Sequence, residues 1–217
     1  MCIRDRYVAA LVELAKASLD AGQATAALDF LERARRYPDN LAEGKLAGAQ
    51  ENHIHFYRGQ ASAQLGNASR AEEAYRLATR GSAELGAALY YNDQPPEMVL
   101  YQALAHAALG NANRAGALCR MLVDYGEKHA GDDAKMDYFA VSLPDFLVFD
   151  DDLTRRNRIH CHYMAGLGYL GLGAAEQAMA VFDAALALEP AHLGATTHRR
   201  LAADLYKTAI GVTSQNV

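Results

Sequence analysis

Two pairs of histidines are the first residues of this chain that could do chemistry. His53 and His55 form one pair and His160 and His162 the other, each with a single residue between them. Imidazoles are common metal ligands, but residues two apart on a helix point about 200° away from each other, so neither pair can chelate an ion alone. Ligation by histidines from different parts of the chain is the alternative. We predict hydrogen-bonded or partly exposed imidazoles, with no metal site and no cofactor.

Acidic and sulfur-containing side chains are the second set of candidates. Asp145 and the run Asp150–Asp152 could supply paired carboxylates for general acid and base catalysis. A helix that begins near Leu153 needs an N-cap, however, and this accounts for at least one aspartate of the run. Cys161 has a histidine beside it, but adjacent helical residues diverge by about 100°, and Cys119 occupies a core position. We therefore predict no catalytic residue, and a chain that is not by itself an enzyme.

Composition restricts the class of protein and of partner. Apolar residues make up 51% of the 217 residues, and 21 Lys and Arg stand against 26 Asp and Glu, for a formal charge of −5. This balance argues against a nucleic-acid partner, which needs a basic surface. No apolar run approaches the roughly 20 residues that span a bilayer, so we predict no membrane partner. The three cysteines leave one unpaired under any disulfide scheme, which favours a reducing, cytoplasmic location.

A repeated segment determines the elements that hold these residues. The segments that begin at Gly66 and at Gly110 are identical at five of their first six positions, and the same frame recurs from Gly22 and from Gly173. In each copy an alanine follows the glycine by five residues, and an apolar residue follows that alanine by four. The alanines are Ala27, Ala71, Ala115 and Ala178, and the apolar residues are Leu31, Tyr75, Cys119 and Phe182.

The spacing within the repeat predicts a pair of helices joined at the glycine. Glycine accepts the left-handed conformation that ends a first helix, and the small alanine lets the second helix approach the first closely. Residues four and seven positions after that alanine lie on the same helical face. In the last copy the first helix would bury Ile159, Tyr163, Gly166, Leu167 and Leu170. We expect burial between paired helices of Ala71, Tyr75, Ala115, Ala178, Phe182 and Ala185.

These positions resemble the tetratricopeptide repeat, whose pattern is W-x2-L-G-x2-Y, then A-x3-F, then P. The fourth copy matches with Gly166, Tyr169, Ala178, Phe182 and Pro190, and departs from the pattern at His162 and Ala165. The second copy keeps Gly59, Ala71 and Tyr75, but has Ser62 where tyrosine is usual. The resemblance covers roughly residues 11 to 190. It implies an all-α, tetratricopeptide-like solenoid of about four helix pairs.

The predicted boundaries follow from the repeat. A terminal helix is expected to cover the last pair with an apolar face that contains Leu193, Thr197, Leu201 and Leu205, opposite the polar His198, Arg199, Arg200 and Asp204. Residues 1–6 look like a non-native start, so that the true N-terminus would be missing. The predicted parts are one repeat domain at 7–210, repeats near 7–37, 50–80, 95–128 and 152–189, a capping helix at 191–210, and a disordered tail at 211–217.

Long insertions separate the repeats. The four glycines lie 44, 44 and 63 residues apart, against 34 in a standard repeat, so about 10, 10 and 29 residues are added. Equivalent loops of a solenoid emerge on one edge, which predicts that the insertions share a rim. Aromatic, acidic, amide and histidine side chains are mixed in them, although Pro95, Pro96 and Glu97 are explained by a helix start. Our candidate binding residues on this rim are Glu51, Asn52, His53, Tyr91, Asp93, Gln94, Asp145, Arg156 and His160.

The insertions also resemble the C-terminal repeat region of large bacterial proteins whose uncharacterised β-rich N-terminal domain is thought to act on carbohydrate. Residues 43–46, 50–53, 90–98 and 137–145 carry this likeness. It implies that the chain is a fragment of a larger protein, with a carbohydrate context.

Two functions are compatible with the sequence. The first is a protein-interaction or scaffolding module, whose partner is another protein or a neighbouring domain. The alternative is an accessory part of a glycan-binding or glycan-processing site, with carbohydrate as the partner.

Overall fold

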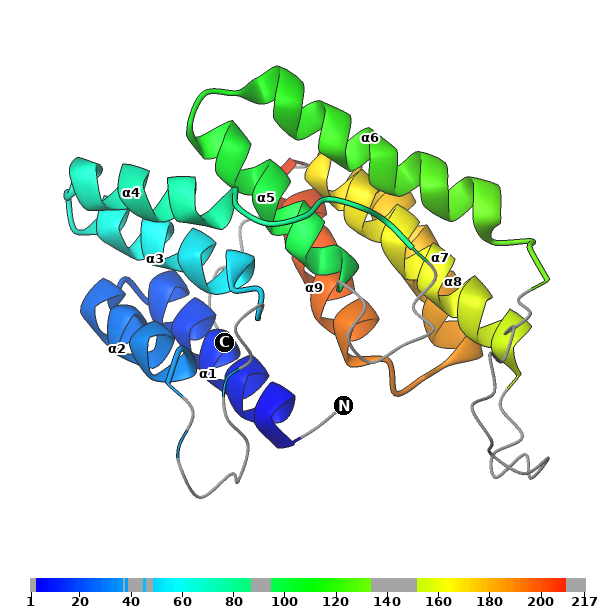
Figure 1. Ribbon diagram of the computed structural model, residues 1–217, viewed down its shortest axis with the longest axis horizontal. Coiled ribbons are helices and arrows are strands. Elements are labelled where there is room, and N and C mark those ends of the chain that lie inside the picture. The colour runs from blue at the N-terminus through cyan, green and yellow to red at the C-terminus, as the bar shows by residue number, and fades with distance from the viewer. Residues whose placement is uncertain are drawn as a thin grey trace. The chain divides into compact units, whose positions relative to one another are not determined.

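The computed structural model describes residues 3–36, 38, 45, 49–86, 95–133 and 152–209. Within these residues every regular element is an α helix, and there is no strand (Figure 1). The predicted all-α class is confirmed, with helix pairs and a terminal helix. The predicted tail at 211–217 lies outside the described residues. The helices are α1 (Ile3–Asp20), α2 (Ala24–Ala34), α3 (Asn52–Gln64), α4 (Ala68–Ala78), α5 (Pro96–Ala108), α6 (Ala112–His129), α7 (Leu153–Gly171), α8 (Ala175–Leu188) and α9 (Leu193–Ala209).

The same turn ends the first helix of all four pairs. In the second pair the amide of Gly66 donates to the carbonyl of Ala63, and the amide of Asn67 donates to the carbonyl of Ser62, both at 2.9 Å. These two bonds form the Schellman motif, which requires a left-handed residue after the helix. Glycine fills that position every time, with φ between 73° and 81°: Gly22, Gly66, Gly110 and Gly173. The predicted glycine C-caps are confirmed.

The chain divides into two compact units. The first contains residues 1–84 and 97–118, and the second contains residues 85–96 and 119–217. Helices α1 to α4, most of α5 and the beginning of α6 belong to the first unit. The rest of α6 belongs to the second unit, together with α7, α8 and α9. The division therefore falls inside the predicted third repeat and not between repeats.

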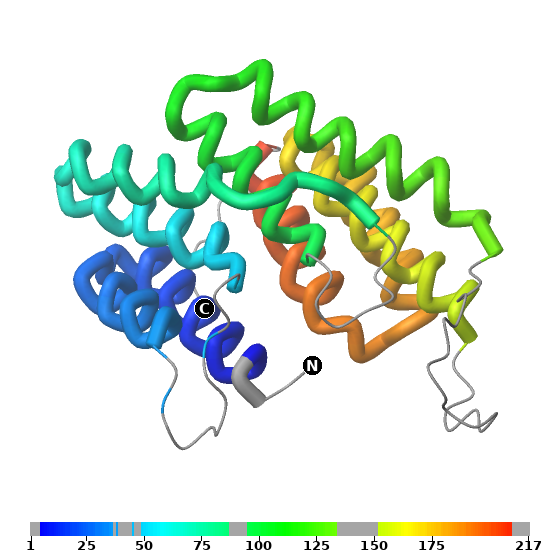
Figure 2. The backbone as a smooth tube through the Cα atoms, in the orientation of Figure 1, coloured from blue at the N-terminus to red at the C-terminus, as the bar shows by residue number. Residues whose placement is uncertain are grey.

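The helical hairpins α1–α2 and α3–α4 of the first unit lie side by side (Figure 2). The core of this unit lies between them. On α2 the buried residues are Ala24, Ala27, Leu31 and Ala34, a stripe at helical spacing. Aromatic rings from α3 and α5 extend this core, because Tyr57 and Tyr101 pack edge to face and their hydroxyls lie 3.3 Å apart. Small residues on α2 thus let the helices approach, and large ones on α3 and α5 fill the remaining space.

Glycines on the first helix of two pairs make room for aromatic rings on the second helix. A Cβ atom on Gly59 would lie 2.4 Å from the ring of Tyr75, and one on Gly166 would lie 2.5 Å from the ring of Phe182. Of the six residues predicted to be buried, Ala71, Ala115, Ala178, Phe182 and Ala185 are buried. Tyr75 is only half-buried, which corrects the prediction. Phe182 is also covered by His198 of α9, whereas Tyr75 packs on Gly59 and Phe56 of its own pair.

Helix α7 is buried on more than one side. Its predicted stripe is present in Ile159, Tyr163, Gly166 and Leu167, but Leu170 is half-buried. The other side is closed by α6, because a Cβ on Gly126 would lie 2.4 Å from the carbonyl oxygen of Cys161. Gly168 makes a similar approach to the carbonyl of Cys119. The backbones of α6 and α7 therefore nearly touch, which a single amphipathic stripe did not predict.

Helix α9 packs on α8 and α7, as the predicted terminal helix does, but with a different face inward. Its buried residues are Ala195, His198 and Ala202, whereas Leu193 and Leu205 are each 39% exposed. His198, predicted to be on the polar face, is buried, and its Nδ1 lies 3.2 Å from the Tyr163 hydroxyl and 2.8 Å from the carbonyl oxygen of Gly194. The small Gly194 lets α9 approach the ring of Tyr163 closely. Close approach thus decides the inward face.

None of the helices in the described part of the chain has the length and apolar character needed to cross a membrane.

Candidate binding site

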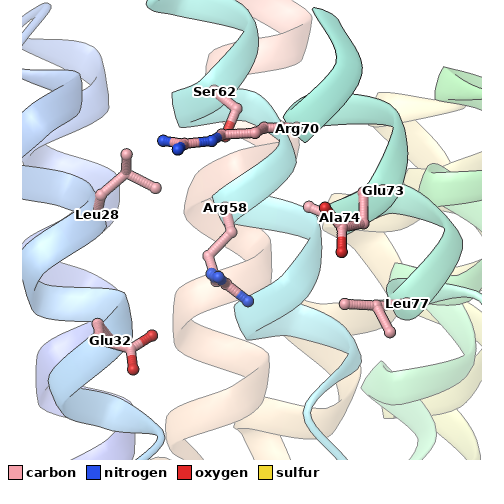
Figure 3. Close-up of a pocket in the computed structure, with 8 residues that line it drawn as sticks. All are labelled: Leu28, Glu32, Arg58, Ser62, Arg70, Glu73, Ala74 and Leu77. Carbon is pink, nitrogen blue, oxygen red and sulfur yellow. The ribbon is translucent and has the colours of Figure 1, made fainter. Parts of the chain in front are cut away.

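A groove of about 290 Å³ lies in the first unit, where it is lined by residues of α2, α3 and α4 (Figure 3). Its residues are spaced three or four apart on each helix, which places them on one face. Each helix contributes both apolar or small and polar side chains. The lining consists of Leu28 and Glu32 of α2, Arg58 and Ser62 of α3, and Arg70, Glu73, Ala74 and Leu77 of α4.

The apolar part of the groove is partly exposed. Leu28 and Leu77 are half-buried on opposite walls, and Ala74 and Ser62 are buried behind them. Leu28 also packs against the core of the first unit, so its position is fixed from behind. A side chain that entered between the two leucines would remove further apolar surface from water.

Two arginines give the groove its polar character. The Nη1 atom of Arg58 donates to Nδ1 of His55 at 3.3 Å, and the side chain of Arg70 is exposed. Among the described residues, neither guanidinium forms an ion pair with a carboxylate. Arginine presents a planar fork of N–H donors that matches a carboxylate in two parallel hydrogen bonds. The groove therefore holds cationic donors that have no carboxylate ion-pair partner among the described residues.

Glu32, which lines the opposite wall, is already compensated by two neighbours. Its carboxylate lies 3.2 Å from Arg35 and 2.9 Å from Arg36. Burial acts to raise the pKa of this carboxyl, but the positive charges of Arg35 and Arg36, with a smaller contribution from Arg58, outweigh burial and hold the pKa below its usual value. Glu32 is therefore ionised at neutral pH, and its charge is used within the chain.

Glu51, one of the residues predicted from the sequence, belongs to a network of charged side chains that reaches the groove residue Arg58 through His55. Its carboxylate is 12% exposed and forms ion pairs with Lys45 and with Arg35, whose Nε lies 3.5 Å away. Nε2 of His55 lies 3.8 Å from the same carboxylate. His55 in turn accepts a hydrogen bond from the groove residue Arg58, whereas Glu51 itself does not line the groove.

The imidazole of His55 lies between Arg58 and Glu51 and is neutral at neutral pH. Desolvation, assisted by the charges of Arg58 and Arg35, lowers the pKa of His55 to about 4. A neutral imidazole with its proton on Nε2 can accept from Arg58 at Nδ1 while it faces Glu51. The imidazole is thus hydrogen-bonded and partly buried, as the sequence predicted for its pair.

Asn52 and His53, two further candidates, make contacts within the folded chain that stabilise its helices. The amide nitrogen of Asn52 donates to the carbonyls of Ala78 and Arg80 at 2.7 Å each, and the residue is 3% exposed. It therefore satisfies carbonyls at and just beyond the end of α4 and fixes the start of α3 beside them. The ring of His53 packs at 5.9 Å from that of Tyr101.

The remaining candidates lie in the second unit or outside the described residues. His160 is 9% exposed and its Nε2 donates to the carbonyl of Gly86 at 3.0 Å, which joins α7 to the start of the second insertion. Arg156 is exposed on the first turns of α7. The candidates Tyr91, Asp93, Gln94 and Asp145 are outside the described residues, so the shared rim stays a prediction. The sequence missed Arg58 and Arg70, whose only signal was a basic residue on a helical face.

The residues considered for catalysis are buried in the core or cap a helix, where the structure describes them. Cys119 and Cys161 are buried, and burial raises the pKa of each thiol to about 11, so both are protonated at neutral pH. Asp152 caps α7 by accepting from the amide of Arg155 at 2.9 Å, which confirms the predicted cap. Asp150 and Asp151 lie outside the described residues. In the described part of the chain, no three His, Cys, Asp or Glu side chains are placed to hold a metal ion.

Comparisons with known proteins leave the chain to be interpreted from its own residues. No protein-family model matches it. No solved structure matches it either. The likenesses to tetratricopeptide repeats and to carbohydrate-related bacterial proteins therefore remain resemblances of sequence.

Proposed function

We propose that this chain is a protein-interaction or scaffolding module, and that the groove between α2 and α4 is its binding site. The observation that carries the proposal is the groove itself. Two half-buried leucines, Leu28 of α2 and Leu77 of α4, line its two sides, beside two arginines that form no ion pair with a described carboxylate. Stacked helical hairpins commonly present extended surfaces of this kind to protein segments.

The chemistry of the groove suits recognition better than catalysis. Its ionisable side chains are two arginines and two glutamates. An arginine stays protonated at neutral pH and cannot exchange a proton with a substrate. Glu32 is held ionised by Arg35 and Arg36, so it is a poor general acid. Fixed charges beside apolar walls give orientation and specificity to a bound segment.

The test is a selection of peptides from a random library displayed on phage, followed by binding measurements with groove variants. Glu73→Trp puts a large side chain into the groove from an exposed position of α4, so the selected peptides should lose most of their affinity. Glu72→Trp is the matched control, because Glu72 is also exposed on α4 but does not line the groove.

The expected result is loss of binding with Glu73→Trp and normal binding with Glu72→Trp. The proposal fails if no peptide is selected, or if the selected peptides bind both variants like the parent. A panel of oligosaccharides measured in parallel tests the carbohydrate role that the second resemblance implies.

A further inference from the structure

We infer that the groove binds an acidic segment of a partner protein, one that presents a side-chain carboxylate next to an aliphatic side chain. This inference rests on the proposed function and specifies the partner's chemistry. It starts from the two arginines, whose side chains both extend into the space between α2 and α4 (Figure 3). Their strongest possible partner is an ionised oxygen acid.

The charges that line the groove favour a carboxylate over a phosphate. Glu32 forms ion pairs with Arg35 and Arg36, and Arg58 contributes least to lowering its pKa, so Arg58, Arg70 and Glu73 are the groove charges that face a ligand. These three side chains carry one net positive charge between them. A single carboxylate balances that charge, whereas a phosphate dianion or a nucleic-acid backbone would exceed it and meet the negative charge of Glu73.

The apolar walls require an aliphatic neighbour for that carboxylate. Leu28 and Leu77 are half-buried on the two sides of the groove, and Ala74 lies behind them with only 6% of its surface exposed. A side chain such as leucine could pack between them while a carboxylate meets the arginines. The volume of about 290 Å³ lies at the lower limit of organic-ligand sites, which measure about 300–1,000 Å³, and it has room for one or two side chains of a protein segment.

A hydrogen bond to His55 orients the side chain of Arg58 before this contact is made. Arg58 donates to Nδ1 of His55, and Glu51 faces the other nitrogen of the same imidazole. Because one N–H group of Arg58 is occupied, its side chain is oriented before a ligand arrives and loses less conformational freedom on binding.

The inference is tested with three peptides that share leucine positions and differ only at their polar positions, which are Glu, Gln or Lys. Both peptide ends are blocked, so that only side chains supply carboxylates. Binding is measured by fluorescence anisotropy. The parent should bind the Glu peptide about tenfold or more tightly than the Gln peptide, and the Lys peptide more weakly still. Added salt should weaken the Glu peptide most.

Variants assign the effect to the groove. Arg70→Gln should weaken binding of the Glu peptide about tenfold and leave the Gln peptide nearly unchanged, and Arg70→Lys should restore part of the loss. Arg76→Gln is the matched control, because Arg76 lies on α4, pairs with Glu72 and does not line the groove. Arg70 is exposed, so these changes should leave the circular dichroism spectrum and thermal midpoint unaltered.

The outcomes separate this inference from the proposed function. Equal binding of the Glu and Gln peptides overturns the inference, and so does an Arg70→Gln variant that binds the Glu peptide like the parent. Failure of all three peptides also overturns it. In each case the proposed function still stands if library peptides bind and Glu73→Trp abolishes their binding.

Discussion

The carboxylate of Glu51 and the imidazole of His55 belong to a network of side chains that reaches Arg58 in the groove. Glu51 is held by Lys45 and Arg35, and His55 carries its influence to Arg58. The imidazole can accept the Arg58 hydrogen bond only while it is neutral. Arg58 is therefore held by a histidine that does not itself line the groove.

Acidification should destabilise the folded chain partly through His55. Its pKa is about 4 in the folded state and near 6.5 when exposed, so the unfolded chain binds the proton first as the pH falls. The stabilising contribution of the neutral form is complete above about pH 6.5 and is lost between there and about pH 4, an effect on the order of 2 kcal/mol. Urea unfolding across this range should show a shallower pH dependence for His55→Gln. Parallel curves for parent and variant would contradict this assignment.

Phe182→Ala should be among the most destabilising changes. The side chain has no exposed surface and lies against Gly166, so its loss leaves a cavity and should cost about 3–5 kcal/mol. Tyr75→Ala is the matched control at the equivalent repeat position, where the ring is half-buried, and it should cost less. Chemical denaturation measures both. An equal or larger loss at Tyr75 would refute this order.

Close approach of helices is the dominant feature at the scale of the elements. On two faces of α7, glycines replace side chains, so that Phe182 of α8 and the backbone of α6 come near. Small residues on α9 do the same for Tyr163. Such contacts are specific because one added methyl group has no room.

Gly126→Ala should destabilise the second unit although alanine has the higher helix propensity. Propensity would contribute a gain of roughly 0.5–1 kcal/mol, but the new Cβ would lie 2.4 Å from the carbonyl oxygen of Cys161. Overpacking of this kind costs about 1–3 kcal/mol, so the net change should be a loss. Gly131→Ala is the control, since its Cβ would meet nothing within 4 Å. Thermal unfolding followed by circular dichroism distinguishes them, and a raised midpoint for Gly126→Ala would exclude the close contact.

At the scale of the whole molecule, the described helices form two compact units, and two helices contribute residues to both: α5 through Pro96 alone, and α6 through both of its halves. The chain carries a net charge of −5, whereas Arg58, Arg70 and Glu73 of the groove sum to one positive charge. An acidic partner would therefore meet attraction at the groove and weak repulsion elsewhere. This favours one orientation of binding over others.

Deleting everything after Pro190 should lower the solubility and thermal stability of the chain. The deletion removes α9 and uncovers Phe182 and Tyr163, whose rings contact His198. Exposed apolar surface of this kind promotes aggregation. Size-exclusion chromatography and thermal unfolding compare the truncated and complete chains. A truncated chain that is as soluble as the complete one and has an unchanged thermal midpoint would show that α9 does not cover the core.

The sequence by itself determined the helix pairs, their turns and most of their buried second-helix positions. These features depend on local signals. The glycines at 22, 66, 110 and 173 adopt the left-handed conformation that ends each first helix, and apolar residues spaced three and four positions apart define one helical face. The cap at Asp152 follows from the same local chemistry, because its side chain reaches an amide only three residues away.

Only the tertiary structure decided which of two plausible faces is buried and which side chains meet across the chain. The inward face of α9 follows Gly194, Ala195 and Ala202 because close approach to Tyr163 outweighs the burial of larger leucines. The groove likewise joins residues of α2, α3 and α4 that lie up to 49 positions apart, from Leu28 to Leu77. Local spacing fixes a helix and its stripe, but contact between distant residues depends on the summed packing of all the helices around them.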